Sequence, residues 1–227
     1  MLHRPVEATP GKRTLGCHTK GMTEYNPTVF LVDDDEAVRD SLSLLMKSVA
    51  LTSRSFASAG EFLAEYDPEC PGCLVLDIRM PGMSGMELQQ KLIEMRAILP
   101  IIFITGHGDI PMAVEAMQRG AVDFIPKPFR DHELLDRINK ALESDRENRD
   151  TLLEREEVEK RIEELTPREK QVMELVVQGK ANKVIAGDLD VSQRTVEIHR
   201  ARVMEKMRVR SLAQLVRMVM QIQEQPF

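Results

Sequence analysis

Short apolar runs alternate with amphipathic stretches between residues 28 and 142, and this alternation restricts the possible folds more than any other feature of the chain. Five runs are strand candidates: Thr28–Val32, Leu51–Phe56, Cys73–Asp77, Ile101–Thr105 and Val122–Ile125. The helix candidates are Glu36–Val49, Ser58–Ala64, Ser84–Arg96, Ile110–Arg119 and Asp131–Leu142. Near-continuous apolar strands that alternate with helices are typical of a parallel sheet covered on both faces. We therefore expect an α/β domain over residues 26–142, with a doubly wound five-stranded parallel sheet.

The last 62 residues contain only helix signals. Thr166-Pro167-Arg168-Glu169 is a capping box, and Gly179 is suited to end that helix. Three further helices are predicted: Asn182–Leu189, one capped by Ser192 that reaches about Met207, and one capped by Ser211 and Gln214. Four short helices with a tight turn at Asp190-Val191 indicate a small all-α helix-turn-helix domain over residues 165–227. Asp tolerates the left-handed conformation such a turn needs, whereas Gly187 weakens the second helix.

The remaining segments differ from these domains in composition. Residues 1–25 lack periodicity and are expected to be a disordered extension, with Met22 as an alternative start. Residues 143–164 are charge-dense without Gly or Pro, which predicts a helical linker, although the apolar positions keep no clean heptad. Residues 26–165 carry 16 Lys and Arg against 28 Asp and Glu, whereas residues 166–227 carry 11 against 7. An acidic body with a basic second domain suggests that the second domain contacts a polyanion.

Composition excludes several classes of protein. No window approaches the roughly 18 apolar residues that a membrane helix needs, and the first 25 residues contain no apolar signal-peptide core. Three cysteines are too few for a disulfide framework, so we expect a reducing, cytoplasmic setting. The chain has no Trp and only two Tyr, which disfavours large aromatic binding platforms.

Polar residues follow the predicted strands at the point where each strand ends. The set comprises Asp33, Asp34, Asp77, Thr105 and Lys127. The carboxyl ends of parallel strands meet at one edge of a sheet, so these side chains are expected to lie together. Clustered carboxylates with open water positions suit magnesium, and a carboxylate beside magnesium, a hydroxyl and an ammonium can accept a phosphoryl group. Asp35 is expected to be an N-cap or surface residue.

Three other features of this domain have competing interpretations. A phosphatase with an Asp nucleophile needs a second Asp two residues later, but that position is Arg79, which does not shuttle protons at neutral pH. Cys70-Pro71-Gly72-Cys73 leads into a strand and not into a helix, which favours structural cysteines over a redox pair. His107 follows Thr105 closely, but a single His in a loop is more often a bystander than a catalyst.

The third helix of the second domain has two distinct faces on a wheel of 100° per residue. Val196, Val203 and Met207 form the predicted buried side. The opposite face presents Arg194, Glu197, Ile198, Ala201 and Glu205, and this is the face that a recognition helix presents to a major groove. Arg194 is suited to guanine and Glu197 to cytosine, whereas Lys183, Thr195, Arg202, Lys206 and Arg208 are expected to contact phosphates. A solvated helix face is the simpler alternative.

Several motifs carry a resemblance to a known family. The segments 29–39 (VFLVDDDEAVR), 74–85 (LVLDIRMPGMSG), 104–106 and 123–129 (DFIPKPF) resemble a two-component receiver domain, a flavodoxin-like fold, over about 120 residues. The resemblance implies that Asp77 is the phospho-acceptor, and that Asp33, Asp34, Asp77 and the backbone carbonyl of Arg79 bind magnesium. It also implies switch roles for Thr105, Lys127 and Phe124, and a cis Lys127-Pro128 peptide bond. Phe124 lacks the hydroxyl of the Tyr that is frequent at its position.

The second domain, from Leu165 to Met218, resembles the LuxR/NarL-type DNA-binding domain, and its third helix resembles that of the FixJ-type branch. This resemblance implies a response regulator, not an enzyme, that a sensor histidine kinase phosphorylates. Phosphorylation is then expected to produce a homodimer through residues such as Val114 and Met117, although core packing is the alternative for both. The dimer would bind promoter DNA and, with RNA polymerase as a further partner, activate transcription. A receiver-controlled module that docks on protein or RNA is the alternative function.

Overall fold

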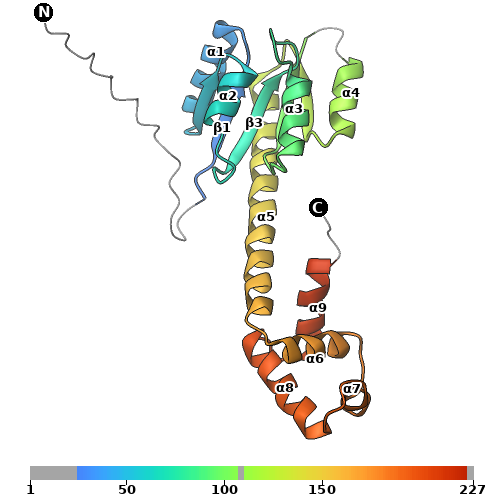
Figure 1. Ribbon diagram of the computed structural model, residues 1–227. Coiled ribbons are helices and arrows are strands. Elements are labelled where there is room, and N and C mark those ends of the chain that lie inside the picture. The colour runs from blue at the N-terminus through green and yellow to red at the C-terminus, as the bar shows by residue number, and fades with distance from the viewer. Residues whose placement is uncertain (1–24, 107–109, 224–227) are drawn as a thin grey trace, which may run out of the picture. The chain divides into compact units, whose positions relative to one another are not determined.

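A parallel sheet with the strand order β2-β1-β3-β4-β5 forms the centre of the first half of the chain (Figure 1). Its strands are β1 (Thr28–Val32), β2 (Thr52–Phe56), β3 (Gly72–Asp77), β4 (Ile101–Thr105) and β5 (Asp123–Pro126). Every residue of β1, β3 and β4 is buried, which explains their near-continuous apolar sequences. The predicted fold class is confirmed, and the strand order reverses between β1 and β3, where such sheets place their functional groups.

The computed structural model describes residues 25–106 and 110–223, and the chain divides after Arg146 into two compact units. The N-terminal residues up to 24, Met22 among them, and His107 lie outside the described residues. Within these residues, no helix combines the length and the apolar character that crossing a membrane requires.

Helices cover both faces of the sheet. They are α1 (Glu36–Ser48), α2 (Ala59–Glu65), α3 (Gly85–Glu94), α4 (Ile110–Gln118) and α5 (Asp131–Glu163). The α1 and α5 helices pack on one face around Met46 and Ile138, whereas α2, α3 and α4 pack on the other around Phe62 and Leu88. The helices pack on the two faces of the sheet and not across the carboxyl ends of its strands. The loops after β1, β3 and β5 can therefore meet at that edge.

The predicted last helix of the sheet domain and the predicted linker form one uninterrupted helix, α5. Asp145, inside the expected solvated linker, is fully buried, and its carboxylate accepts a hydrogen bond from the backbone N–H of Gly72 at 2.9 Å. The hydroxyl of Tyr25 donates to the carbonyl of Leu142 at 2.7 Å and lies 3.1 Å from Asp145. The packed unit thus includes Tyr25, from the expected disordered extension, and the first residues of the expected linker.

The second unit contains α6 (Pro167–Val177), α7 (Asn182–Asp188), α8 (Gln193–Lys206) and α9 (Leu212–Gln223). The capping box of Thr166 and Glu169 begins α6, and Gly179 follows this helix with φ +80°. Asp190 adopts the expected left-handed conformation, with φ +51°, in the turn between α7 and α8. The core joins apolar residues of all four helices with Val158 and Ile162 of α5, so the last turns of α5 belong to this unit.

Candidate functional site

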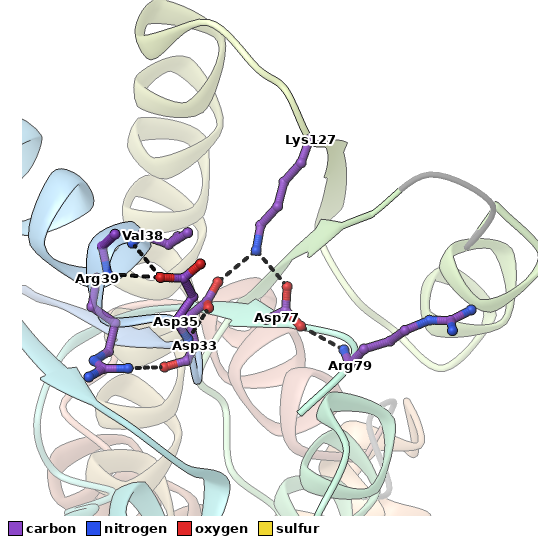
Figure 2. A network of polar contacts seen from close by, with 8 residues as sticks. Asp33, Asp35, Val38, Arg39, Asp77, Arg79 and Lys127 are labelled. Atoms are coloured by element: carbon purple, nitrogen blue, oxygen red, sulfur yellow. Dashed lines mark hydrogen bonds and ion pairs between the residues drawn. The ribbon is translucent and has the colours of Figure 1, made fainter. Parts of the chain in front are cut away.

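Three charged side chains converge where β1, β3 and β5 end (Figure 2). Asp33 directly follows β1 and is 2% exposed, and Asp77, the last residue of β3, is 8% exposed. Lys127 follows β5, and its Nζ lies 2.8 Å from Oδ2 of Asp33 and 2.8 Å from Oδ1 of Asp77. The parallel pairing of β1 with β3 brings the two carboxylates to one edge, as the sequence predicts.

Backbone groups fix both carboxylates from the other side. The backbone N–H of Asp35 donates to Oδ1 of Asp33 at 2.9 Å, and the backbone N–H of Arg79 donates to Oδ2 of Asp77 at 2.7 Å. Arg39, on α1, donates from its guanidinium to the carbonyl of Asp33 at 2.8 Å. No role was predicted for Arg39 from the sequence. Its position six residues after Asp33, one turn into the helix that follows, was the signal that could have indicated this contact. Asp35 caps α1, as expected.

The environment of the site changes the proton affinity of two of its groups. Burial raises the pKa of Asp77 above its usual value, although the hydrogen bond from Lys127 opposes this effect, and the nearby Asp33 adds to it. Burial on its own lowers the pKa of Lys127, but the hydrogen bonds to Asp33 and Asp77 outweigh burial and raise it. Lys127 therefore remains an ammonium at neutral pH, and its charge compensates the paired carboxylates.

The carboxylates of Asp33 and Asp77 already converge on one cation, the ammonium of Lys127, and carboxylate oxygens are ligands that magnesium prefers. These two residues therefore fit the predicted magnesium site. Asp34 is exposed, and the contact seen for the Arg79 backbone is made by its N–H and not its carbonyl. Among the described residues, no three His, Cys, Asp or Glu side chains are grouped as a metal site, so the full ligand set stays a prediction.

The remaining predicted switch residues lie on the neighbouring strands. Thr105 is buried at the end of β4, which pairs with β3, and its carbonyl accepts from the backbone N–H of Lys127 at 2.7 Å. Phe124 of β5 is half-buried and packs against the core on the α3 and α4 face. The Lys127-Pro128 peptide bond is cis. Thr105 thus lies at the same sheet edge as Asp33, Asp77 and Lys127, whereas Phe124 pairs with Phe103 in the middle of β4.

The predicted dimerisation residues are exposed, whereas the two cysteines of the Cys70–Cys73 segment are buried. Val114 and Met117 of α4 are 48% and 37% exposed, which excludes core packing for both. Cys70 and Cys73 are both buried, and Sγ of Cys70 lies 4.0 Å from Oγ1 of Thr28. Burial, and secondarily the charge of Asp145, raises the pKa of Cys73 far above its usual range, which keeps this thiol protonated and unreactive.

The two faces of α8 match the helix wheel. Val196, Val203 and Met207 are at most 2% exposed, whereas the opposite face lies open. Its exposed residues are Arg194, Glu197, Ile198, Ala201 and Glu205, with Arg202 exposed at its edge. Lys183 of α7 is also exposed, and Thr195 is half-buried with its hydroxyl 2.8 Å from that of Ser192. Arg200 donates to the side chain of Asn182 at 2.7 Å and so ties α8 to α7.

Lys206, a predicted phosphate contact, is engaged within its own domain, and its contact with DNA stays a prediction. Its Nζ lies 2.7 Å from Oε2 of Glu169, whose side chain is 2% exposed, and donates to the carbonyl of Glu164 at 3.1 Å. The hydrogen bond from Lys206, with that from the Thr166 backbone, lowers the pKa of Glu169 to about 2. A wheel of α8 alone misses this pair, because the carboxylate lies on another helix.

Comparisons with known proteins identify both units. Residues 29–139 match the family model of the response regulator receiver domain, and residues 163–219 match that of the bacterial regulatory proteins of the luxR family. Nodulation protein W of Bradyrhizobium diazoefficiens is 48% identical over 206 residues, which cover 91% of this chain and 90% of that protein. The chain belongs to the response regulators that carry a LuxR-type DNA-binding domain.

Other members of this family are similarly close. The transcriptional regulatory protein FixJ of Rhizobium meliloti is 47% identical over 199 residues, covering 88% of this chain and 97% of that protein. The solved structure of the response regulator StyR superposes with a TM-score of 0.77 at 47% identity, over 86% of this chain and 99% of that chain. Full-length FixJ from B. japonicum gives a TM-score of 0.55 at 40% identity, over 89% and 100%. The predicted FixJ-type resemblance is thereby confirmed.

Proposed function

We propose that this response regulator accepts a phosphoryl group on Asp77 from a sensor histidine kinase. The observation that carries the proposal is the position of Lys127, whose ammonium lies 2.8 Å from both Asp77 and Asp33. An Asp77 oxygen would attack phosphorus in line as the bond between phosphorus and the kinase histidine breaks, which leaves an aspartyl phosphate. Lys127 would neutralise the transferring oxygens. The protein is itself the acceptor, so we do not assign it an enzymatic activity.

Magnesium is the cofactor that this donor set suits. Asp33, Asp34 and Asp77, with the backbone carbonyl of Arg79, would hold it, and bound magnesium supplies charge stabilisation for the phosphoryl oxygens. Asp33 is held ready by the backbone of Asp35 and by Arg39. The side chain of Asp34 is exposed and could turn toward the ion. The next residue, Asp35, is held in place as the cap of α1.

Phosphorylation would change the face formed by α4 and β5. A phosphoryl group adds a charge of about −1.5 to −2, which would draw in Thr105 and Lys127 and reposition Phe124. The exposed side chains of Val114 and Met117 would then join two copies. A homodimer would present two α8 helices to half-sites spaced about one turn of DNA apart. Promoter binding in the cytoplasm, with activation of transcription through RNA polymerase, is the outcome we propose.

A second function in a different class is a receiver-controlled module that docks on protein or RNA. It shares the phosphorylation chemistry and differs only in what α8 contacts. The mixed charge of the exposed α8 face, with Glu197 beside Arg194, favours selective base contacts over a general polyanion surface. An electrophoretic shift that stays negative for phosphorylated protein over all promoter fragments would favour the docking module instead.

The phosphorylation chemistry is tested with wild type, Asp77→Asn and a control, Asp35→Asn, each treated with acetyl phosphate and magnesium. Asp35 is an exposed carboxylate two residues from Asp33, and Asn also caps helices well. Intact mass and solution molecular weight are measured together. We expect a phosphoryl adduct and a dimer for wild type and Asp35→Asn only. No adduct in wild type would refute the mechanism, whereas an adduct without a dimer would refute only the dimer step.

DNA recognition is tested with phosphorylated Arg194→Ala and, as a charge-matched control, Arg217→Ala. Both arginines are exposed, but Arg217 lies on α9 and outside the proposed recognition face. Loss of a bidentate base contact costs about 1–3 kcal/mol, or roughly 5- to 150-fold in affinity for the target promoter. Equal losses for both variants would indicate that the α8 face does not read bases.

A further inference from the structure

The α4 helix is weakly attached to the receiver unit except at its carboxyl end. Of its described side chains, only Ala116 is buried, Met112 is half-buried, and the others are exposed. Between α3 and α4 lies a groove of about 470 Å³. Its lining includes Met86 and Lys91 of α3 and Met112 and Glu115 of α4. The space beside α4 allows this helix to change its tilt at the cost of few core contacts, chiefly those of Met112.

The carboxyl end of α4 is, in contrast, held by several hydrogen bonds. The carbonyl of Ala116 accepts from the backbone N–H groups of Arg119 at 3.2 Å and Ala121 at 3.0 Å. Gly120, with φ +92°, donates to the carbonyl of Met117 at 3.0 Å. These bonds form a Schellman motif, and the N–H of Val122, on the carbonyl of Ile101, then fixes the chain to the sheet.

One side chain from another helix joins this motif. Gln89 of α3 is 1% exposed, and its Nε2 donates to the carbonyl of Ala116 at 3.0 Å. Its Oε1 is buried and has no hydrogen-bond partner among the described residues. A buried amide that is satisfied on one side only costs stability relative to an apolar side chain of the same shape. Among the described residues, the hydrogen bond to the carbonyl of Ala116 is therefore the one interaction by which the Gln89 amide stabilises the structure.

We propose that Gln89 is the positioning residue of a pivot, so that phosphorylation tilts α4 about Ala116 and does not displace the whole helix. The inference rests on the proposed phosphorylation of Asp77 and adds the element about which the switch turns. The amino-terminal part of α4 follows β4, which ends in the switch residue Thr105. Its carboxyl end stays on α3 through Gln89, so the exposed side chain of Val114 swings, whereas that of Met117, next to the pivot, moves little.

The test compares wild type with Gln89→Met and the control Gln90→Met. Methionine preserves the length of the side chain and removes the amide, and Gln90 is an exposed neighbour on α3 that contacts Glu94 within its own helix. Adduct formation is followed by intact mass. Amide hydrogen exchange at Arg119, Gly120 and Ala121 is followed by nuclear magnetic resonance before and after phosphorylation. The informative quantity is the ratio of the two exchange rates, which a merely structural loss of stability leaves unchanged.

We expect the adduct in all three proteins. The exchange ratio stays near one for wild type and Gln90→Met. For Gln89→Met it rises about fivefold or more, because without the Gln89 bond the tilt caused by phosphorylation also loosens the carboxyl end of α4. A fivefold rise in wild type as well, or no difference between the two variants, would overturn the pivot while leaving the phosphorylation chemistry intact. Absence of the adduct in all three proteins would overturn the proposed function and the pivot together.

Discussion

At the scale of single residues, the sheet edge places the carboxylates of Asp33 and Asp77 around the ammonium of Lys127, and the ionised form of Asp77 is destabilised there. Burial raises its pKa, so the folded state disfavours the ionised form. A raised carboxyl pKa costs no stability where the group is protonated in both states. The cost appears as pH rises above the unfolded value of about 3.9 and is complete above the folded pKa.

Asp77→Asn is therefore expected to raise the melting temperature at pH 7, by an amount that shrinks toward zero as pH falls to about 4. Thermal unfolding of both proteins across this pH range measures the difference. An Asn still offers one oxygen to Lys127 or to the backbone N–H of Arg79, so the geometry of the loop is kept. A difference that is constant over the whole range would show that ionisation of Asp77 is not its origin.

Gly85 illustrates a second constraint at the residue scale, a close approach of backbone to backbone. A Cβ at this position would lie 2.3 Å from the carbonyl oxygen of Asp77 and 3.1 Å from the Cα of Ile78. Gly85→Ala is expected to destabilise the receiver unit by about 1–3 kcal/mol and to slow adduct formation, because the loop carrying Asp77 must shift. Gly60→Ala, in α2 with only the Ser58 hydroxyl at 4.0 Å, is the control. Chemical denaturation and the rate of mass increase measure both effects, and equal behaviour of the two variants would contradict this account.

At the scale of elements, the sequence was most informative where local signals and burial agree. Strands Thr28–Val32 and Ile101–Thr105 were predicted to the residue, because both flanks carry polar or turn residues. Side-chain caps such as Ser192 likewise placed the start of α8. Contacts between distant segments were not predictable. The carboxylate of Asp145, for example, accepts a hydrogen bond from Gly72, which lies 73 residues earlier in the chain. A charge-dense stretch therefore suggested a solvated linker, although its first turn is packed against the sheet unit.

The short α7 helix provides a prediction at the same scale, because Gly187 lies inside it without a positive φ. A Cβ there meets no atom within 4 Å, so Gly187→Ala is expected to stabilise the second unit by up to about 1 kcal/mol. Gly179→Ala is the matched opposite, because Gly179 has φ +80° and equally open space, and it should destabilise. Denaturant unfolding of the two variants measures the contrast. Two shifts of the same sign would contradict a backbone origin.

At the scale of the whole molecule, charge is divided between the two units. Residues 26–165 carry 28 acidic against 16 basic side chains, and residues 166–227 carry 11 basic against 7 acidic. The sequence alone thus assigned polyanion binding to the second part of the chain. It did not show which basic residues are available for this task, because Glu169 on α6 engages Lys206 of α8. Availability depends on tertiary contacts and not on residue type.

The salt dependence of promoter binding is expected to distinguish Lys183, which would contact a DNA phosphate, from Lys206, which is paired with Glu169. Removing one lysine–phosphate interaction lowers the slope of log affinity against log salt by about 0.9. Lys183 is exposed on α7, so Lys183→Ala is expected to lower the slope by about this amount with little change in stability. Lys206→Ala is expected to keep the slope, because its ammonium is bound to Glu169 and to the carbonyl of Glu164. It should instead lower the stability of the second unit, because the nearly buried Glu169 is deprived of its cation. Binding titrations at several salt concentrations, with denaturant unfolding of the same proteins, measure both quantities. A lower slope for Lys206→Ala would restore this lysine to the phosphate-contacting set.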